Sequence, residues 1–587
     1  MKTKTYTFLL MAAFVLALAL SGCIKKKQPP HITFSKVASI VPQDIFEAMR
    51  GSVSPDGSRV VYSVYRAGLE SLNLVLLDLK SGEKKMLTTG KGFRRSPDWS
   101  PDGKQLIYAA SGQEKTGLWI LDLTSGNERQ LLPDSISGIA FAPQWTRQGK
   151  VVFSCRTNPA SIWSVNPDGS QLQQIEGAEG EFAALSNDEK FLVSFRKDSG
   201  NFYLELYDFQ TGLSKILLKD FITIGEHPVW GDDNIIYFVA AMGTDPQLHA
   251  WSFSISDKTL MRIDSLDHEA LRISMLNGNQ IALVSIQPEV TVGTLPIEGG
   301  ELSFVLQDAR SQFFLPSWLP GGRGLVFTSG PWRHSDMMVR RNIPWDIGTV
   351  EFDKQGQPNI ILAKDNEDYG PVYSPDGAWL AFHAHFDNTD DIYITRASLT
   401  DGIIKLSDGG IYETGGPDWS PDGNAVVYAA HQQDAPYSRA FIAAFDPATG
   451  KPYNVPNEVP LDDFEGSVFS PRFSRDGKKI AFTGSMADGT SGVYTVALTG
   501  GKPFCASKYQ SGENYSGPEW SRDGNSLFFS SNYGGDRYRL MKVSAGGGEA
   551  LVVYEGERSV LHPRISPDGK QLAVTIWNNK TNIWIQQ

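Results

Sequence analysis

Short apolar runs alternate with polar turns along almost the whole chain, and helical periodicity is almost absent. The most frequent turn reads Ser-x-Asp-Gly, and an apolar run follows it each time. It begins at Ser54, Ser100, Ser374, Ser420, Ser474, Ser521 and Ser566. Asp can hydrogen-bond its own backbone and Gly accepts a positive φ, so the turn reverses the chain tightly. The pattern therefore predicts antiparallel strands joined by tight turns.

Degenerate copies of this pattern fill the stretch between Gly103 and Ser374, which gives twelve units in all, spaced by 40 to 54 residues. One four-stranded blade of a β-propeller has a similar period. A single ring of twelve blades would leave a wide, poorly filled hole. We therefore predict an all-β fold of two tandem six-bladed propellers, with seven plus five blades as the alternative.

The repeat also predicts domain boundaries. The first propeller is expected at 50–308 and the second at 309–587, with a connecting segment at 23–49. That segment contains an alternating, strand-like stretch at 32–40 and one helical turn at 41–48. Unpaired sheet edges invite aggregation, so we expect 32–40 to add a capping strand to one ring. Which ring it caps is left open.

A Pro-x-aromatic triplet often precedes the turn, as in Pro97-Asp98-Trp99 and Pro417-Asp418-Trp419, and a Gly-x-Trp or Gly-x-Tyr strand follows in several units. This combination resembles the TolB-like propeller repeat and covers about 50–587. The resemblance implies the fold and leaves the function open, because propellers with this repeat occur in binding proteins and beside hydrolase domains alike. The tryptophans of the triplet are expected to pack between blades.

The first residues predict where in the cell the protein is located. Lys2 and Lys4 precede thirteen unbroken apolar residues, Phe8 to Leu20, which are too few for a mature membrane-spanning helix and typical of a signal peptide at 1–22. Leu20-Ser-Gly-Cys23 resembles the bacterial lipobox, which implies acylation of Cys23 and a membrane partner through this lipid anchor. Ile24 follows, and by the same resemblance this favours the outer membrane, with the protein facing the periplasm.

The composition excludes some classes of partner and some kinds of covalent cross-link. Acidic residues number 66 and basic residues 54, giving a net charge of −12 with no basic cluster beyond Lys25 to Lys27, so we predict no nucleic-acid partner. Besides Cys23 the chain has only Cys155 and Cys505, which excludes a disulfide framework and predicts two small buried side chains.

Candidate catalytic chemistry is sparse. The sequence contains no G-x-S-x-G elbow, zinc-protease motif, P-loop or dinucleotide fingerprint, so we expect no cofactor, no catalytic residue and no enzyme activity. One alternative remains: His383, His385 and His431 lie near equivalent strand ends of adjacent units. Such a group would suit a divalent metal or an acidic saccharide, as in a polysaccharide lyase-like enzyme.

Large polar residues also precede the Pro-x-aromatic triplets, where innermost strands begin at one mouth of the propeller channel. The predicted channel-mouth residues are Arg94, Arg95, Glu226, His227, Glu413, Glu513, Tyr515 and His562. Residues that ring such a mouth are suited to contact a partner. The sequence therefore predicts a membrane-anchored scaffold in the bacterial envelope that binds an envelope protein, a peptide or a saccharide.

Overall fold

The computed structural model describes residues 32–40 and 51–587, apart from short internal segments. Those segments are 67–70, 113–114, 133–139, 158, 199–200, 224–225, 244, 267–268, 307–310, 332–344, 355–356, 364–366, 387–388, 401, 408–415, 433–434, 488–489, 510–515 and 532–537. The predicted signal peptide and the helical turn at 41–48 lie outside the described residues.

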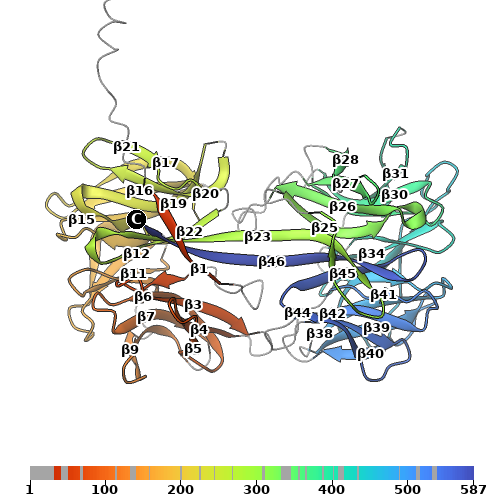
Figure 1. The fold of residues 1–587 in the computed structure, drawn as a ribbon, viewed down its shortest axis with the longest axis horizontal. Helices are drawn as coiled ribbons and strands as arrows, with labels where there is room; N and C mark the ends of the chain where they lie inside the picture. Colours follow the sequence, from red (N-terminus) through yellow and green to blue (C-terminus); the bar gives the residue numbers. More distant parts are fainter. Residues whose placement is uncertain are drawn as a thin grey trace, which may run out of the picture.

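The described chain forms two lobes of β-sheet, which are joined by two long strands (Figure 1). Apart from strands, it contains three short 3₁₀ turns, η1 (Asp232–Asn234), η2 (Asn277–Asn279) and η3 (Pro320–Gly322), each at the position of a degenerate turn. The all-β prediction is confirmed. Within the described residues, no helix is long and apolar enough to cross a membrane.

In the first lobe, five consecutive units each contain four antiparallel strands. The units are β2 (Ser52–Val53), β3 (Arg59–Arg66), β4 (Ser71–Asp78) and β5 (Lys84–Met86); β6 (Gly92–Trp99), β7 (Gln105–Ser111), β8 (Gly117–Asp122) and β9 (Glu128–Leu132); β10 (Ala140–Trp145), β11 (Val151–Cys155), β12 (Ser161–Val165) and β13 (Gln173–Glu179); β14 (Glu181–Leu185), β15 (Phe191–Asp198), β16 (Asn201–Asp208) and β17 (Leu213–Ile222); β18 (Val229–Trp230), β19 (Ile235–Met242), β20 (Asp245–Ser254) and β21 (Thr259–Arg262).

The second lobe repeats this arrangement in five separate four-stranded sheets. These are β25 (Ser311–Trp318), β26 (Gly324–Pro331), β27 (Asp346–Glu351) and β28 (Asn359–Leu362); β29 (Asp368–Tyr373), β30 (Trp379–Phe386), β31 (Thr389–Arg396) and β32 (Ile404–Lys405); β33 (Asp418–Trp419), β34 (Ala425–Ala430), β35 (Arg439–Ala444) and β36 (Asn457–Glu458); β37 (Gly466–Phe473), β38 (Lys479–Met486), β39 (Ser491–Ala497) and β40 (Phe504–Tyr509); β41 (Glu519–Trp520), β42 (Ser526–Ser531), β43 (Tyr538–Ser544) and β44 (Leu551–Gly556).

A sixth unit of each lobe comes from one shared sheet. The 16-residue strands β23 (Ile281–Pro296) and β46 (Gln571–Gln586) pair antiparallel along almost their whole length and run from one lobe into the other. In the first lobe, β22 (Glu269–Met275) and β1 (Phe34–Ile40) flank this pair. In the second, β45 (Ser559–Ile565) and β24 (Ser303–Phe304) flank it. The pairings support the partition into two rings of six, which stays a prediction.

The shared sheet differs from the sequence analysis in two ways. The run Asn582–Ile585 reads as a third strand of the last unit, yet it continues β46 without a turn and lies in the first lobe. Strand β24 and the second half of β23 both precede residue 308 in the sequence, but they belong to the second lobe. A boundary near 308 therefore separates the other units but not the strands of this sheet, because long-range pairing decides where those strands lie.

The strand-like segment at 32–40 takes part in the first lobe. Strand β1 pairs with the end of β46, from Phe34 opposite Gln586 to Ile40 opposite Thr581. The backbone N–H of Gln587 also donates to the carbonyl oxygen of Thr33, at 2.9 Å. Because β1 covers the free edge of β46, residues near both ends of the described chain complete one four-stranded unit.

The Ser-x-Asp-Gly turns share one local geometry. In the first, Ser54 Oγ donates to Asp56 Oδ1 at 2.6 Å and accepts from the backbone N–H of Arg59 at 2.9 Å, while Gly57 has φ 72°. The same serine-to-aspartate bond, 2.6 to 2.8 Å long, occurs in the other six turns and at Ser186. These bonds lie within six residues, so the sequence encodes each turn locally.

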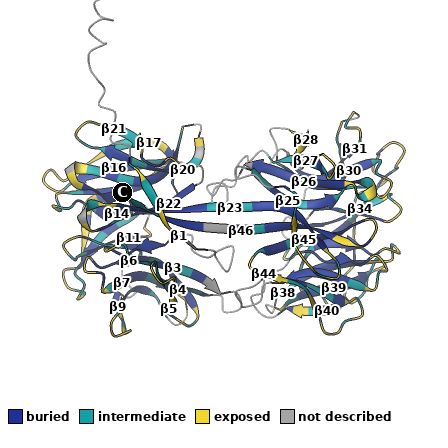
Figure 2. Cartoon of the chain, in the orientation of Figure 1, coloured by how far each residue is buried: buried dark blue, intermediate teal, exposed yellow. Residues whose placement is uncertain are grey.

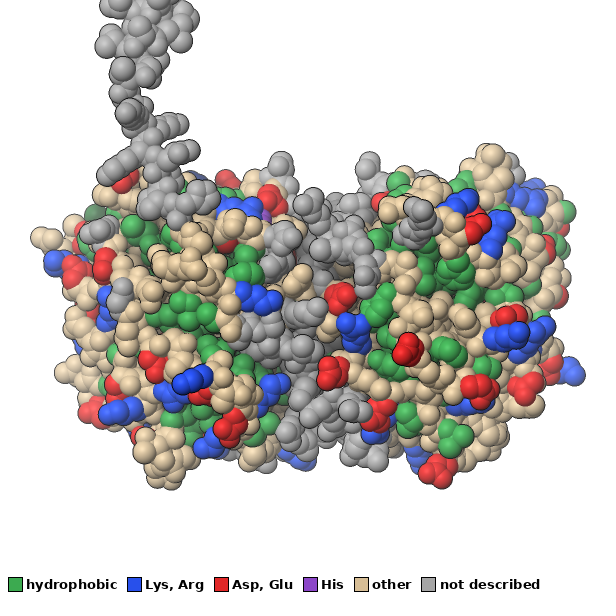
Figure 3. Space-filling model, viewed as in Figure 1, with side chains coloured by type: hydrophobic (Ala, Val, Ile, Leu, Met, Phe, Trp, Pro, Cys, Tyr) green, Lys and Arg blue, Asp and Glu red, His purple; other side chains and the backbone are tan. Residues whose placement is uncertain are grey.

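Apolar side chains from neighbouring units pack against each other to form the core. Buried positions cover the middle of most strands and both ends of β23 and β46 (Figure 2), as at Leu283, Val292, Val574 and Ile583. On the face in Figure 3, acidic and basic side chains are interspersed, and no field of a single sign forms. That surface agrees with the mixed, mildly acidic composition.

Candidate functional site

In five units, the tryptophan of the Pro-x-aromatic triplet joins the unit to a neighbouring one. In several units the indole Nε1–H donates to a backbone carbonyl at the middle position of the triplet, or its equivalent, in the neighbouring unit. The bonds are Trp99 to Ser52, Trp230 to Ala184, Trp419 to Val372, Trp520 to Arg472 and Trp318 to Arg564, at 2.8 to 3.1 Å. The triplet therefore fixes the innermost strands side by side around a central channel.

A cavity of about 600 Å³ occupies the channel of the first lobe. Each unit contributes to its wall through its innermost strand. The contributing residues include Ser52 of β2, Asp98 of β6, Gln144 and Trp145 of β10, Ala184 of β14, Trp230 of β18 and Arg272 of β22. The turns that follow these strands provide the rim, with Arg147, Asn187, Asp232 and Asn279. This volume is typical of small-molecule sites.

A chain of buried charges crosses this channel. Arg272 Nη2 lies 3.2 Å from Asp98 Oδ1, and Nη1 lies 3.6 Å from Glu226 Oε2. Asp98 Oδ2 also accepts from the backbone N–H of Trp145 at 2.9 Å. Burial raises the pKa of Asp98, while the Arg272 guanidinium opposes that shift. One arginine thus links three units of the ring and neutralises part of the acidic wall.

His227 lies in the wall beside this arginine and is only 4% exposed. The backbone of Ala183 and of Phe182 interacts with the imidazole and opposes the lowering of its pKa. The Phe182 ring meets the imidazole edge to face, with the centroids 5.7 Å apart. Burial, and then the charge of Arg272, lower the pKa of His227 to about 3. The side chain is therefore a neutral donor and acceptor.

The second lobe fills its channel differently. Arg564 Nη1 lies 2.7 Å from Asp418 Oδ1 and 3.8 Å from Glu519 Oε2, and Arg564 Nη2 donates to the carbonyl of Pro417 at 2.9 Å. Arg475 lies 3.4 Å from the other oxygen of Glu519. Burial raises the pKa of Glu519 despite these arginines. The charges of this channel therefore pair with one another.

Arg472 occupies the same triplet position as Asp418 and Glu519, in the unit between theirs. Its Nη1 donates to the carbonyl oxygens of Gly416 and Pro471, at 2.8 and 2.9 Å. Burial, and then the neighbouring Arg564, lower the pKa of Arg472 to about 9. Charges of alternating sign thus follow each other around part of this ring.

The predicted channel-mouth residues have different environments. Arg94 is buried and its guanidinium donates to the carbonyls of residues 89–92, so it fixes a loop. Arg95 is exposed and lies over the Phe93 ring. Glu226 and His227 adjoin the first channel. His562 is half-buried in the second lobe, with Nδ1 3.2 Å from Thr575 Oγ1. Glu413, Glu513 and Tyr515 lie outside the described residues.

The sequence analysis missed the charges that cross the channels. Asp98, Asp418, Arg472 and Glu519 occupy the middle of Pro-x-aromatic triplets, so a charged residue within an apolar strand was the available signal. Arg272 is also a charged residue within an apolar strand, but its unit lacks the triplet that would have aligned it with the others.

The three histidines of the alternative prediction have separate surroundings. His383 is fully buried and stacks on Tyr369, with the centroids 4.9 Å apart. His385 Nδ1 lies 2.8 Å from Asp390 Oδ1 on the same hairpin. His431 is half-buried after β34. Among the described residues, no group of three His, Cys, Asp or Glu side chains is placed to hold a metal ion.

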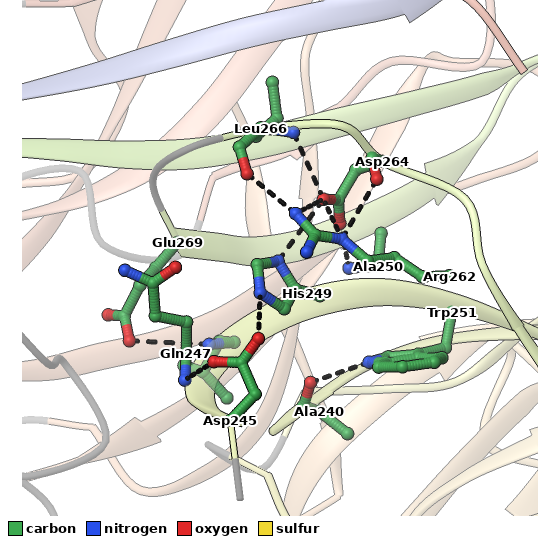
Figure 4. A network of polar contacts seen from close by, with 11 residues as sticks. Ala240, Asp245, Gln247, His249, Ala250, Trp251, Arg262, Asp264, Leu266 and Glu269 are labelled. Carbon is green, nitrogen blue, oxygen red and sulfur yellow. Dashed lines mark hydrogen bonds and ion pairs between the residues drawn. The ribbon is translucent and has the colours of Figure 1, made fainter. Parts of the chain in front are cut away.

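Another buried polar network lies in the β18–β21 unit (Figure 4). His249 Nε2 is 3.2 Å from Asp245 Oδ2, and Nδ1 is 3.3 Å from Asp264 Oδ1. Arg262 Nη2 lies 3.0 Å from the same Asp264 oxygen and donates to the carbonyl of Leu266 at 2.7 Å. These charges pair within the unit and hold β20, β21 and the following loop together.

Cys155 is buried and Cys505 is half-buried, and both are free thiols. Burial raises the pKa of each, so neither is an activated nucleophile. Cys23 lies outside the described residues.

Comparison with known proteins identifies relatives of this fold. The family model of the TolB beta propeller domain matches residues 39–252 and 456–587, which is more than half of the chain. The Tol-Pal system protein TolB of Gluconobacter oxydans is 27% identical over 150 residues, which are 25% of this chain and 32% of that protein. The uncharacterized peptidase YuxL of Bacillus subtilis is 33% identical over 117 residues, 19% of this chain and 17% of that protein.

This chain therefore spans about a third or less of the length of these two curated relatives. Among solved structures, the putative TolB from Agrobacterium tumefaciens is 18% identical, with a TM-score of 0.40, covering 49% of this chain and 98% of that one. Repeat, strand pairing and family match agree, and the chain belongs to the TolB beta propeller domain family.

Proposed function

We propose that this protein is a binding scaffold of the bacterial cell envelope, and that the channel of the first propeller, 50–308 completed by the end of β46, is its binding site. The observation that carries this proposal is the 600 Å³ cavity with polar groups from six units. A rigid ring of inner strands suits binding, because the site is formed before the ligand arrives.

The second propeller, 309–587 completed by part of β23, has a structural role in this proposal. Its channel charges satisfy one another through Arg564, Asp418 and Glu519. The shared strands β23 and β46 join it rigidly to the first propeller. The second propeller therefore holds the first propeller at a fixed position relative to any partner that binds the surface of the second.

The proposal includes a lipid anchor at Cys23, outer-membrane location and a periplasmic orientation. It is supported by the signal-peptide pattern and the lipobox resemblance in the sequence. Two or more acyl chains anchor a protein durably, whereas one chain binds reversibly. A tethered scaffold of this kind needs no catalytic group or cofactor to perform its role.

The test is photo-crosslinking in intact cells. Asn187 at the cavity rim is replaced by p-benzoylphenylalanine, and Tyr453, which is 60% exposed on the second propeller, is replaced in a control variant. Irradiation is followed by detergent extraction, affinity capture and mass spectrometry. We expect adducts that form at position 187 and not at 453. Equal or absent adducts at the two positions would overturn the assignment of the binding site.

A further inference from the structure

We propose that a groove in the second propeller, between its last unit and its first, binds an arginine side chain of a partner protein. The groove has a volume of about 530 Å³, and its lining includes Trp318, Gly322, Phe352, Asp568 and Gln571. We call it the closure groove. It is separate from the channel of the first propeller, so the inference does not depend on the function proposed for that channel.

The first two units of the first propeller form a counterpart of this groove, and two bonds identify the corresponding residues. The indole N–H of Trp318 donates to a carbonyl oxygen of the neighbouring unit as that of Trp99 does, at 2.8 Å in both cases. The backbone N–H of Gln571 donates to the turn serine of its unit at 3.0 Å, as that of Arg59 does at 2.9 Å. Trp318 therefore corresponds to Trp99, and Gln571 corresponds to Arg59.

Arg59 occupies the counterpart groove with its own side chain. Its guanidinium carbon lies 4.9 Å from the centroid of the Trp99 ring, and its Nη2 donates to the carbonyl oxygen of Gly103 at 2.9 Å. Burial raises the pKa of Asp56, but hydrogen bonds within its turn and the charge of Arg59 lower it below its ordinary value. Cation–π contacts and charge-assisted hydrogen bonds are both stabilising, so an arginine suits a groove with these walls.

The closure groove has corresponding walls and a different side chain at the position of that arginine. Gly322 has φ 72° and Gly103 has φ 68°, and each donates its N–H to the first residue of its turn, at 2.9 and 2.8 Å. Asp568 occupies the third position of its turn, as Asp56 does. Gln571, which is shorter than arginine and uncharged, stands in the place of Arg59 and is exposed. An arginine from another protein can therefore take the position that Arg59 takes in the first propeller.

Aromatic rings line the closure groove. Trp318 is half-buried, and Phe352, which is 46% exposed, meets it edge to face with the ring centroids 6.0 Å apart. A planar guanidinium can stack on an aromatic face and still direct N–H groups at oxygen atoms around it, which a lysine ammonium does less well. The geometry of the walls therefore favours arginine over lysine.

The charges at the groove favour one added cation. The charged residues of the lining are Glu351 and Asp568, and both are acidic. Basic residues act on them from outside the lining: Lys354 and Arg323 on Glu351, and Lys570 and Arg522 on Asp568. A long basic segment would be repelled by these outer cations, so a single arginine is the better match.

Fluorine NMR of the purified full chain, labelled with 5-fluorotryptophan, tests the inference. The resonance of Trp318 is assigned by its loss in Trp318→Phe. The probe is the peptide acetyl-Gly-Ser-Arg-Ser-Gly-amide, and two comparator peptides have citrulline or lysine instead of arginine. We expect the arginine peptide to shift the Trp318 resonance saturably, with a Kd of about 5 mM or lower, and each comparator to bind at least about threefold more weakly.

Three variants locate the site. Gln571→Arg supplies the cation from within the chain, so it should weaken peptide binding at least about tenfold and raise the unfolding midpoint. Phe352→Ala removes an exposed ring and should weaken binding by about twofold to fivefold. Phe504→Ala, at a ring on β40 that is 48% exposed, is the matched control and should leave the affinity unchanged.

Three results would overturn the inference. They are the absence of a saturable shift of the Trp318 resonance at about 20 mM arginine peptide, binding of the citrulline or lysine peptide as tight as that of the arginine peptide, and an affinity that Gln571→Arg leaves unchanged. Sedimentation of the unlabelled protein distinguishes another occupant. A dimer that Gln571→Arg dissociates would assign the groove to a second copy of this chain and reject a different protein as its partner.

Discussion

The indole nitrogen of Trp318 donates a 2.8 Å hydrogen bond to the carbonyl oxygen of Arg564, which lies 246 residues further along the chain. Trp318 ends the first inner strand of the second propeller, β25, and Arg564 lies in the last, β45. The same bond that joins successive units elsewhere thus closes this ring. Closure therefore depends on a repeated contact as well as on the shared strands.

Trp318→Phe should weaken the contact between the first and last inner strands of the second propeller. The variant loses one hydrogen bond and leaves a buried carbonyl oxygen with one donor fewer, so the free energy of unfolding should fall by about 1–3 kcal/mol. Urea unfolding monitored by hydrogen exchange in residues 311–331 measures the effect. Trp145→Phe is the matched control, because its indole nitrogen has no hydrogen-bond partner to lose. Equal stability of wild type and Trp318→Phe would contradict the role of this bond.

Arg564→Met should destabilise the second propeller by about 3–5 kcal/mol, because Asp418 would lose the arginine that it pairs with at 2.7 Å and Glu519 would keep only Arg475. The double variant Arg564→Met/Asp418→Asn should recover part of that loss, since the stranded charge of Asp418 is removed. A double-mutant cycle from urea unfolding gives the coupling energy. Strict additivity of the two substitutions would show that the Arg564–Asp418 contact has no energetic effect.

Ile583→Ala should destabilise the first propeller although Ile583 lies only four residues before the last residue in the sequence. Ile583 is fully buried and packs with Val60, Tyr62 and Ala282. Large-to-small substitution at such a site costs about 2–5 kcal/mol. Limited proteolysis with mass spectrometry should show earlier cleavage within residues 51–280 than within 311–570. The exposed control Val455→Ala should leave the cleavage pattern unchanged.

Stability should decrease as the pH falls below about 6.5. Burial and nearby arginines lower the pKa of His227 and of His562 from 6.5 to about 3. Between these values the unfolded chain binds a proton that the folded chain excludes. The stability contribution is therefore complete above about pH 6.5 and is lost as the pH falls towards 3, at up to about 1.4 kcal/mol per pH unit for each histidine.

His562→Phe tests this dependence. Removing one of the two imidazoles with a lowered pKa should reduce the slope of unfolding free energy against pH in this range, as measured by urea unfolding at several pH values. Above about pH 7 the variant differs from wild type only through packing and the lost contact to Thr575. A slope equal to that of wild type would show that His562 titrates normally in the folded protein.

Cys23→Ser should abolish lipid attachment. The variant would lose incorporation of a labelled fatty acid and leave the membrane fraction, because the acyl chains provide the proposed anchor. Fatty-acid labelling and cell fractionation measure both effects. Cys155→Ser, at a buried free thiol, is the control and should keep the label. Retention of label by Cys23→Ser would reject acylation at this position.

The sequence predicted those parts of the fold whose hydrogen bonds are local. Each Ser-x-Asp-Gly turn is held by bonds such as Ser54 to Asp56, within a few residues. Apolar alternation placed the strands, and the repeat spacing indicated a propeller. For the site, the same reasoning predicted Glu226 and His227 at a channel mouth; His227 lines the cavity of the first lobe and Glu226 lies against Arg272, and their role in binding stays a prediction.

The sequence by itself determined the repeating unit, its turns and the all-β class, since these depend on contacts between near neighbours. Only the tertiary structure decided that Asn582–Ile585 completes the first propeller and that Arg272 reaches Asp98 across 174 positions. Strand exchange along β23 and β46 and charge pairing across a channel join residues that are distant in the chain. The free energy of these long-range contacts depends on which units lie opposite each other in the closed ring. No local sequence pattern determines that arrangement.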